Sequence, residues 1–98
     1  MLGDKLGAEQ AEAWGMIWRC IDDDQLQSEA LKLARHLATQ PTLGLGMIKK
    51  LLTASTANSL NEQLDLEKDT MRMLGQSHDY QEGVAAFLEK RAAHFTGG

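Results

Sequence analysis

The sequence predicts an all-α domain of about five helices, with one short strand-like segment near residues 16–21. Apolar residues recur at helical spacing over most of the 98 residues. Helix-capping residues or a proline precede the later apolar stretches. Hydrophobic residues make up 43% of a chain that is long enough for one domain only. We therefore expect residues 1–98 to form a single helical domain.

The first helix is predicted over residues 8–14. Ala8, Ala11 and Trp14 are spaced as on one helical face, and Gly15 is suited to end the helix. Residues 16–21 then concentrate apolar side chains, which favours a strand or an extended segment. A lone strand cannot satisfy its own backbone N–H and C=O groups, and the sequence offers no good second strand. This segment is a first indication that part of the protein is missing.

The second and third helices are predicted from start signals and apolar faces. Asp22–Asp24 suit the positive end of a helix. The face of that helix comprises Leu26, Ala30, Leu33, Ala34, Leu37 and Ala38. Pro41 suits the first turn of a third helix, in which Gly44 and Gly46 favour close packing against a neighbour. Its apolar positions are Leu45, Ile48, Leu51 and Leu52.

The fourth and fifth helices have polar start signals. Ser59 and Glu62 have the spacing of a capping box, and Ser77 or Asp79 can cap the fifth helix. Residues 95–98 are expected to form a tail. Short connections predict that neighbours among the last four helices run roughly antiparallel. The fifth helix is expected to turn inward Tyr80, Val84, Phe87 and Leu88.

Composition excludes several classes of function. The net charge is −4, and basic residues are scattered, so we expect no nucleic-acid partner. No apolar run is long enough to span a membrane, and the opening residues do not resemble a signal peptide. Cys20 is the single cysteine, so no internal disulfide can form, and it is expected to be a small buried residue. We expect a cytoplasmic, reducing location.

Residue types and spacing do not reveal a complete active site. His36, His78 and His94 lack metal-ligand spacing, and no second cysteine supports a zinc site, so no metal is expected. The acidic run at residues 65–69 is predicted to be a charged outer face, because residues two apart on a helix point in different directions. These observations alone indicate a helical, acidic domain.

Several stretches, taken in order, resemble one known protein family. The sequence EGVAAFLEKR at residues 82–91, followed by Phe95, resembles the closing motif of the enoyl-CoA hydratase/isomerase (crotonase) family. Residues 3–11 and 14–17 are similar to the family's A-x-x-A-x-x-x-G-L-V segment. In the middle of the chain, residues 34–38, which precede Pro41, and residues 48–50 also resemble the family. The resemblance covers essentially the whole chain.

The resemblance implies that the chain is the C-terminal helical domain of a crotonase-type fold. In that family the preceding part is a spiral of repeated ββα turns. It supplies the backbone N–H groups that polarise the thioester carbonyl, and the acidic residues that move protons. None of those groups can be matched here, so we expect no catalytic residue in this chain. The terminal helices of the family also imply a homo-oligomer, a trimer or a hexamer.

The resemblance further implies two kinds of binding residue. In the closing helix of the family, the Phe packs near the adenine of CoA and the Lys three residues later meets a phosphate. These positions are Phe87 and Lys90, and a ring and an ammonium suit those two groups. Met71 matches a position that can line the acyl pocket. The alternatives are core packing for Phe87 and Met71 and a solvated charge for Lys90. No cofactor is implied, because the CoA thioester is the substrate.

Details of the resemblance narrow the implied activity. Residues 3–6, 14–18 and 95–97 are most similar to the branch of the family that isomerises a 1,2-epoxyphenylacetyl-CoA in phenylacetate breakdown. Thr96 stands where some hydratases have another Lys, which removes one expected phosphate contact. Two alternatives stay open: an enoyl-CoA hydratase of fatty-acid oxidation, and a free-standing helical oligomerisation module without a catalytic parent.

Overall fold

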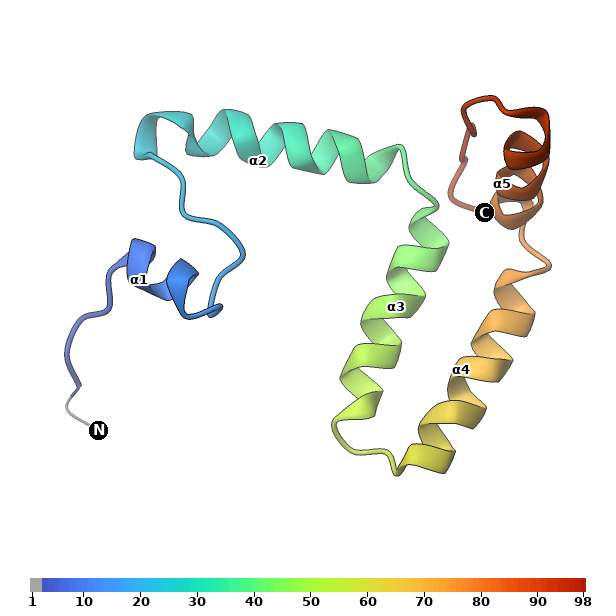
Figure 1. The fold of residues 1–98 in the computed structure, drawn as a ribbon, viewed down its shortest axis with the longest axis horizontal. Coiled ribbons are helices and arrows are strands. Elements are labelled where there is room, and N and C mark those ends of the chain that lie inside the picture. Colours follow the sequence, from blue (N-terminus) through green and yellow to red (C-terminus); the bar gives the residue numbers. More distant parts are fainter. Residues whose placement is uncertain (1–2) are drawn as a thin grey trace. The chain divides into compact units, whose positions relative to one another are not determined.

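The described part of the chain, residues 3–98, consists of five α-helices and their connecting loops (Figure 1). The computed structural model describes residues 3–98, which divide into two compact units, one ending at Leu33 and one comprising Ala34–Gly98. No strand occurs within residues 3–98, so the predicted all-α class is confirmed. The helices are α1 (Ala8–Ala13), α2 (Asp23–Ala38), α3 (Thr42–Ser55), α4 (Leu60–Leu74) and α5 (His78–Glu89).

Residues 16–21 form bends and irregular backbone, so the predicted strand is wrong. The N–H of Met16 donates to the carbonyl of Ala11 at 2.9 Å. The N–H of Cys20 donates to the carboxylate of Glu12 at 2.8 Å. The N–H groups of Met16 and Cys20, which a partner strand could have satisfied, are therefore held by α1 instead.

Helix α1 is short and ends where the sequence predicts. Trp14 follows its last residue, and Gly15 then takes a φ of +73°, in the left-handed region that glycine adopts at little cost. Trp14 and Trp18 expose 66% and 74% of their surface. The predicted end of this helix is confirmed, and its aromatic neighbours are not part of a core within this chain.

Helix α2 begins at the acidic run. Asp23 and Asp24 lie in its first turn and Arg35 and His36 in its last, an arrangement that the helix dipole favours at both ends. No residue of α2 is buried. The apolar residues along it are thus predicted correctly as a face, although this chain does not cover them.

Helices α3 and α4 form an antiparallel hairpin in the Ala34–Gly98 unit (Figure 1). The side-chain amide of Gln63 on α4 donates to the carbonyl of Leu51 on α3 at 3.3 Å. Asn58, in the connection, donates to the Gln63 side-chain oxygen at 3.0 Å. The antiparallel expectation is confirmed for this pair. Within the same unit, α5 follows α4 without packing along it.

The starts of α4 and α5 follow local sequence rules. The N–H of Ser59 donates to the Glu62 carboxylate at 2.8 Å, and the N–H of Glu62 donates back to the Ser59 hydroxyl at 3.4 Å. This is the predicted capping box, and the hydrogen bonds from Ser59 lower the pKa of Glu62. The Ser77 hydroxyl accepts the N–H of Tyr80, so Ser77 rather than Asp79 caps α5.

Few apolar side chains are buried. Within residues 3–98, the buried hydrophobic residues are Ala11 and Ala86. The α5 residues expected to face inward are exposed: Tyr80 52%, Val84 45%, Phe87 82% and Leu88 73%. A Cβ added to Gly44 or Gly46 would meet no atom within 4 Å, so the predicted close packing there is also wrong. Helical spacing identifies an apolar face but not what covers it, and residues 3–98 leave these faces exposed.

The capping box gives a test of the fold. Replacing Ser59 with Ala removes the hydroxyl that accepts the Glu62 N–H, and we expect a loss of about 1 kcal/mol in the free energy of unfolding. Urea denaturation measures this change. Ser28→Ala is the matched control, because the Ser28 hydroxyl bonds only back to Gln25 within α2. An equal loss in both variants would contradict a capping role for Ser59.

Candidate functional site

The chain after α5 turns back and runs antiparallel to that helix (Figure 1). Two acidic side chains one turn apart on α5 hold it. Glu82 accepts a backbone N–H from His94, and Asp79 accepts one from Gly97. The ring of Phe95 lies in ordinary contact with the position of a Cβ at Gly83, at 3.6 Å. Residues 92–98 are therefore docked, and the prediction that residues 95–98 form a tail is wrong.

Asp79 is the buried anchor of this docked segment. It is 3% exposed, and its carboxylate accepts the N–H groups of Thr96 at 2.7 Å and Gly97 at 2.8 Å. Its own N–H donates to the carbonyl of Gly98 at 2.8 Å. These hydrogen bonds, led by that from Thr96, lower the pKa of Asp79 although its burial opposes the shift. The charged carboxylate is thus the form that holds the segment.

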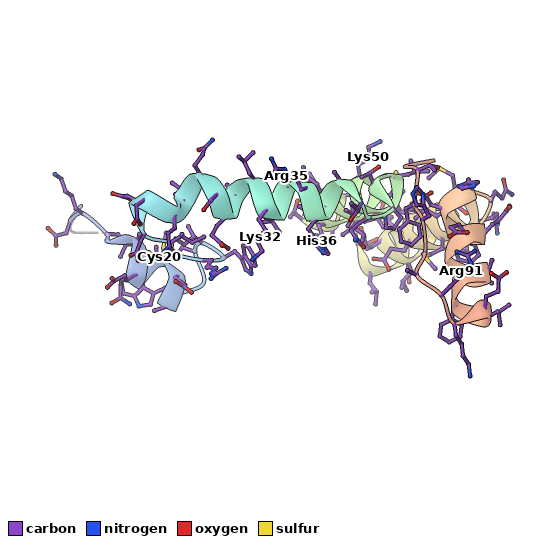
Figure 2. The ribbon with its side chains drawn as sticks, turned by 90° about the horizontal axis from the view of Figure 1, so that it is seen from above. Cys20, Lys32, Arg35, His36, Lys50 and Arg91 are labelled. Carbon is purple, nitrogen blue, oxygen red and sulfur yellow. The ribbon has the colours of Figure 1, made fainter. Side chains whose placement is uncertain are left out.

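Glu82 and Arg91 form the second anchor. Two guanidinium nitrogens of Arg91 donate to the two carboxylate oxygens of Glu82 at 2.6 and 2.9 Å. Glu82 also accepts the N–H of His94 at 2.8 Å, and Arg91 together with this bond lowers the pKa of Glu82 to about 2. The third guanidinium nitrogen of Arg91 donates to Glu89 at 2.6 Å. Figure 2 shows Arg91 beside α5.

Lys90 lies at the turn between α5 and the docked segment, in a left-handed conformation with φ 55° and ψ 39°. The N–H of Lys90 donates to the Phe87 carbonyl at 3.3 Å, and that of Arg91 donates to the Ala86 carbonyl at 3.0 Å. This pair of bonds is a Schellman motif, in which glycine is the usual residue at the position of Lys90. A lysine there costs about 1 kcal/mol of backbone strain. Strained residues of this kind concentrate at functional sites.

Phe87 lies one turn before Lys90 and is almost fully exposed, at 82%. It forms part of the wall of an apolar cavity of about 420 Å³ in the Ala34–Gly98 unit. The start of α3, the end of α4, α5 and the docked segment all contribute to this cavity, through residues that include Leu43, Leu74, Tyr80, Val84 and Phe95. Phe87 is therefore not a core residue within residues 3–98, and its binding role stays a prediction.

Of the three predicted site residues, the structure brings two together. Phe87 lies in the last turn of α5, Lys90 follows that helix, and the N–H of Lys90 donates to the Phe87 carbonyl. Met71 lies on α4, is 65% exposed and is not among the residues that line the cavity. Core packing within this chain does not explain Met71 either. Its role in an acyl pocket stays a prediction.

Sequence reasoning missed Asp79, Glu82 and Arg91 as structural anchors. The spacing of Asp79 and Glu82, three residues apart on one helix, is the signal that was available. In residues 3–98 no cluster of His, Cys, Asp and Glu side chains could hold a metal ion. Cys20 is free and half-buried. None of the helices described is both long and apolar enough to cross a membrane.

Comparison with known proteins gives one consistent result. The family model described as enoyl-CoA hydratase/isomerase matches residues 1–98. The chain is 57% identical over 97 residues to the 1,2-epoxyphenylacetyl-CoA isomerase of Escherichia coli K12, covering 99% of this chain and 37% of that protein. It is 32% identical over 95 residues to the 2,3-dehydroadipyl-CoA hydratase of the same organism, covering 97% of this chain and 37% of that protein.

Solved structures agree in fold. An enoyl-CoA hydratase from Geobacillus kaustophilus HTA426 superposes with a TM-score of 0.92 at 36% identity, covering 98% of this chain and 37% of that one. An enoyl-CoA hydratase from Mycobacterium marinum gives a TM-score of 0.87 at 30% identity, covering 98% and 38%. The match is to the C-terminal helical part of such enzymes. The chain thus spans little more than a third of the length of the curated relatives it matches.

The two anchors predict how docking depends on pH. The pKa of Glu82 falls from its usual 4.5 to about 2, and that of Asp79 is lowered too. A carboxyl with a lowered pKa stabilises the folded state fully above its usual pKa, and this contribution is lost as the pH falls toward the lowered value. We expect docking of residues 92–98 to be unchanged from pH 8 to 5 and to weaken progressively below pH 4.5.

Amide hydrogen exchange at residues 94–97 measures this docking. Asp79→Asn should speed exchange there by about tenfold even at neutral pH, because the amide loses a charged acceptor. Asp69→Asn is the matched control, since Asp69 forms only an exposed ion pair with Arg72 on α4. Equal protection in both variants, or a loss of protection between pH 8 and 6, would contradict the assignment.

Proposed function

This chain belongs to the enoyl-CoA hydratase/isomerase family, and we propose that it is the CoA-binding and oligomerisation part of an acyl-CoA isomerase. The proposed substrate is a 1,2-epoxyphenylacetyl-CoA, and the proposed setting is phenylacetate breakdown. The observation that carries this proposal is the 57% identity to the 1,2-epoxyphenylacetyl-CoA isomerase over nearly the whole chain. We infer a cytoplasmic enzyme that needs no cofactor beyond its CoA thioester substrate.

The second candidate is an enoyl-CoA hydratase, as several relatives carry that name. The identity to relatives named as hydratases is lower, at 42% for a probable enoyl-CoA hydratase of Rhodobacter capsulatus and 32% for the 2,3-dehydroadipyl-CoA hydratase. This difference favours the isomerase. The free-standing oligomerisation module has less support, because the family match extends over all 98 residues and the apolar faces have no cover within residues 3–98.

In this proposal residues 3–98 bind CoA, and the rest of the enzyme carries out the reaction. Phe87 offers an exposed ring face, suited to stacking on adenine, and Lys90 offers an exposed ammonium suited to a phosphate. The N–H of Lys90 donates to the Phe87 carbonyl, so the two residues are close enough to contact neighbouring parts of one nucleotide in this proposal. In this proposal the oxyanion donors and proton-transfer groups belong to the rest of the enzyme, and this chain alone does not turn over substrate.

Homo-oligomerisation is the other proposed role. Large apolar residues are exposed along both helices of the α3–α4 hairpin, including Ile48 at 52%, Leu52 at 65%, Leu60 at 74% and Leu64 at 54%. Extended apolar exposure of this kind marks an interaction surface. A trimer or hexamer, as the family resemblance implies, would cover such surfaces with helices of other copies or with the rest of the enzyme.

The substrate is tested by turnover of the full-length enzyme. We expect kcat/KM for the ring epoxide of phenylacetyl-CoA to exceed that for a straight-chain 2-enoyl-CoA by about a hundredfold or more, since differences in a shaped acyl pocket amount to a few kcal/mol. Steady-state assays of the same preparation on both substrates measure this ratio. A preference for the 2-enoyl-CoA would replace the isomerase proposal with the hydratase.

The CoA site is tested at Lys90. In the full-length enzyme Lys90→Ala should raise KM for the CoA thioester about tenfold or more, because a charge-assisted contact is worth roughly 1.5–3 kcal/mol. The turnover number should change little, since the contact is made equally in ground and transition states. KM for a truncated pantetheine thioester, which lacks the nucleotide, should not change on this substitution.

The left-handed conformation of Lys90 provides a second variant for the same test. Lys90→Gly removes the ammonium but suits the φ of 55°, so the variant should be as stable as the original protein or more stable. It should nevertheless lose CoA affinity as Lys90→Ala does. Lys68→Ala, on α4, is the control for loss of an exposed lysine. An equal effect of Lys90→Ala on both thioesters would show that Lys90 acts through the fold.

A further inference from the structure

We propose that Arg91 is a positioning residue for Lys90: its ion pair with Glu82 fixes the backbone at the end of α5 and keeps nearby carboxylates away from the Lys90 ammonium. This inference rests on the proposed function, in which Lys90 meets a phosphate of CoA. It adds a residue that does not itself contact the substrate.

Arg91 directly follows the strained residue Lys90 and is bound to α5. Lys90 adopts the left-handed conformation, which most residues other than glycine avoid. Arg91 is bound to α5 twice, through its backbone N–H to Ala86 at 3.0 Å and through its guanidinium to Glu82 at 2.6 and 2.9 Å. Lys90, which lies between α5 and the doubly bound Arg91, therefore has a fixed Cα position and a fixed Cα–Cβ direction. The direction in which the Lys90 side chain leaves the helix is thus set by Arg91.

The ion pair between Arg91 and Glu82 is rigid because it consists of two parallel hydrogen bonds. Arg and a carboxylate joined by two parallel hydrogen bonds have a defined geometry that a single contact lacks. The Glu82 side chain is only 16% exposed, and it also holds the N–H of His94 at 2.8 Å. The same carboxylate therefore fixes the chain on both sides of Ala92. Lys90 precedes the fixed stretch directly.

Arg91 also neutralises two carboxylates of α5. Glu89 is the residue before it, and Glu82 lies on the same helix. Both are paired with Arg91, at 2.6 Å in each case. Across residues 3–98, Lys90 has no carboxylate within ion-pair distance. Without Arg91, Glu89 would be free to pair with Lys90 and two unneutralised charges would repel an incoming phosphate.

A purely structural role is the alternative. An exposed ion pair contributes little to stability by itself, and Arg91 is 41% exposed, so Arg91 could simply hold the docked segment. A structural role would change the stability of the protein and would affect every substrate alike. A positioning role changes affinity only for substrates that carry the nucleotide, and only while Lys90 is present.

The test is Arg91→Gln in the full-length enzyme, assayed with the CoA thioester and with a pantetheine thioester. We expect KM for the CoA thioester to rise about fivefold to tenfold, with kcat and the constants for pantetheine unchanged. Arg91→Lys keeps the charge but loses the paired hydrogen bonds, so a smaller rise is expected. Arg72→Gln, which breaks an exposed Arg–Asp pair on α4, is the matched control and should have no effect.

The double variant Lys90→Ala/Arg91→Gln decides how Arg91 acts. If Arg91 works through Lys90, the double variant should be no worse than Lys90→Ala alone. Additive losses would show that Arg91 binds the phosphate directly, and equal losses with both thioesters would show a structural role; either result overturns the inference. If Arg91→Gln does not fold, Arg91→Lys, which loses the paired hydrogen bonds but keeps the charge, carries the test and should still give a CoA-specific rise in KM, smaller than that expected for Arg91→Gln.

The outcomes separate this inference from the proposed function. A CoA-specific effect of Lys90→Ala with no effect of Arg91→Gln would overturn the positioning role and leave the CoA site in place. No CoA-specific effect of Lys90→Ala would overturn the CoA site, and the positioning role with it.

Discussion

Two carboxylates on one face of α5 determine the local structure of the candidate site. Asp79 and Glu82 accept backbone N–H groups of the segment that follows the helix, so the chain must reverse direction immediately after Glu89. That reversal requires a left-handed residue, and Lys90 occupies the position. The docked segment in turn supplies Phe95 to the apolar cavity beside Phe87. The positions of the Phe87 ring and the Lys90 ammonium therefore depend on hydrogen bonds that Asp79 and Glu82 make.

The exposed apolar faces of the helices support the proposal that this chain acts as part of a longer enzyme. Apolar faces occur on α3, α4 and α5 at the spacing the sequence predicts, yet most large side chains on them are exposed. A small domain that folded for itself would bury a larger share of such residues. The coverage of about 37% of each curated relative is consistent with this. Hydrogen bonds from the backbone of residues 94–97 to Asp79 and Glu82, rather than a hydrophobic core, keep α5 and residues 92–98 together.

Local rules predicted most of the helices, whereas longer-range contacts were missed. Ser59 and Glu62 are three residues apart, and their capping box could be predicted from spacing alone. The pairs Glu82–Arg91 and Asp79–Gly97 are nine and eighteen residues apart, and the second uses a backbone N–H that no residue type reveals. Phe87 and Lys90 were predicted as CoA-binding residues from family resemblance, because helical spacing alone places Phe87 in a core.

The way in which the docked segment is held has a consequence for how freely its sequence can vary. Asp79 and Glu82 recognise mainly main-chain groups, which every residue except proline presents alike. Exchanges at His94 should therefore be widely tolerated. Gly97 is different, because its φ is +87° and a Cβ there would come within 2.7 Å of the Thr42 hydroxyl. A complete substitution scan of this segment would be nearly flat at position 94 and would fall steeply at position 97.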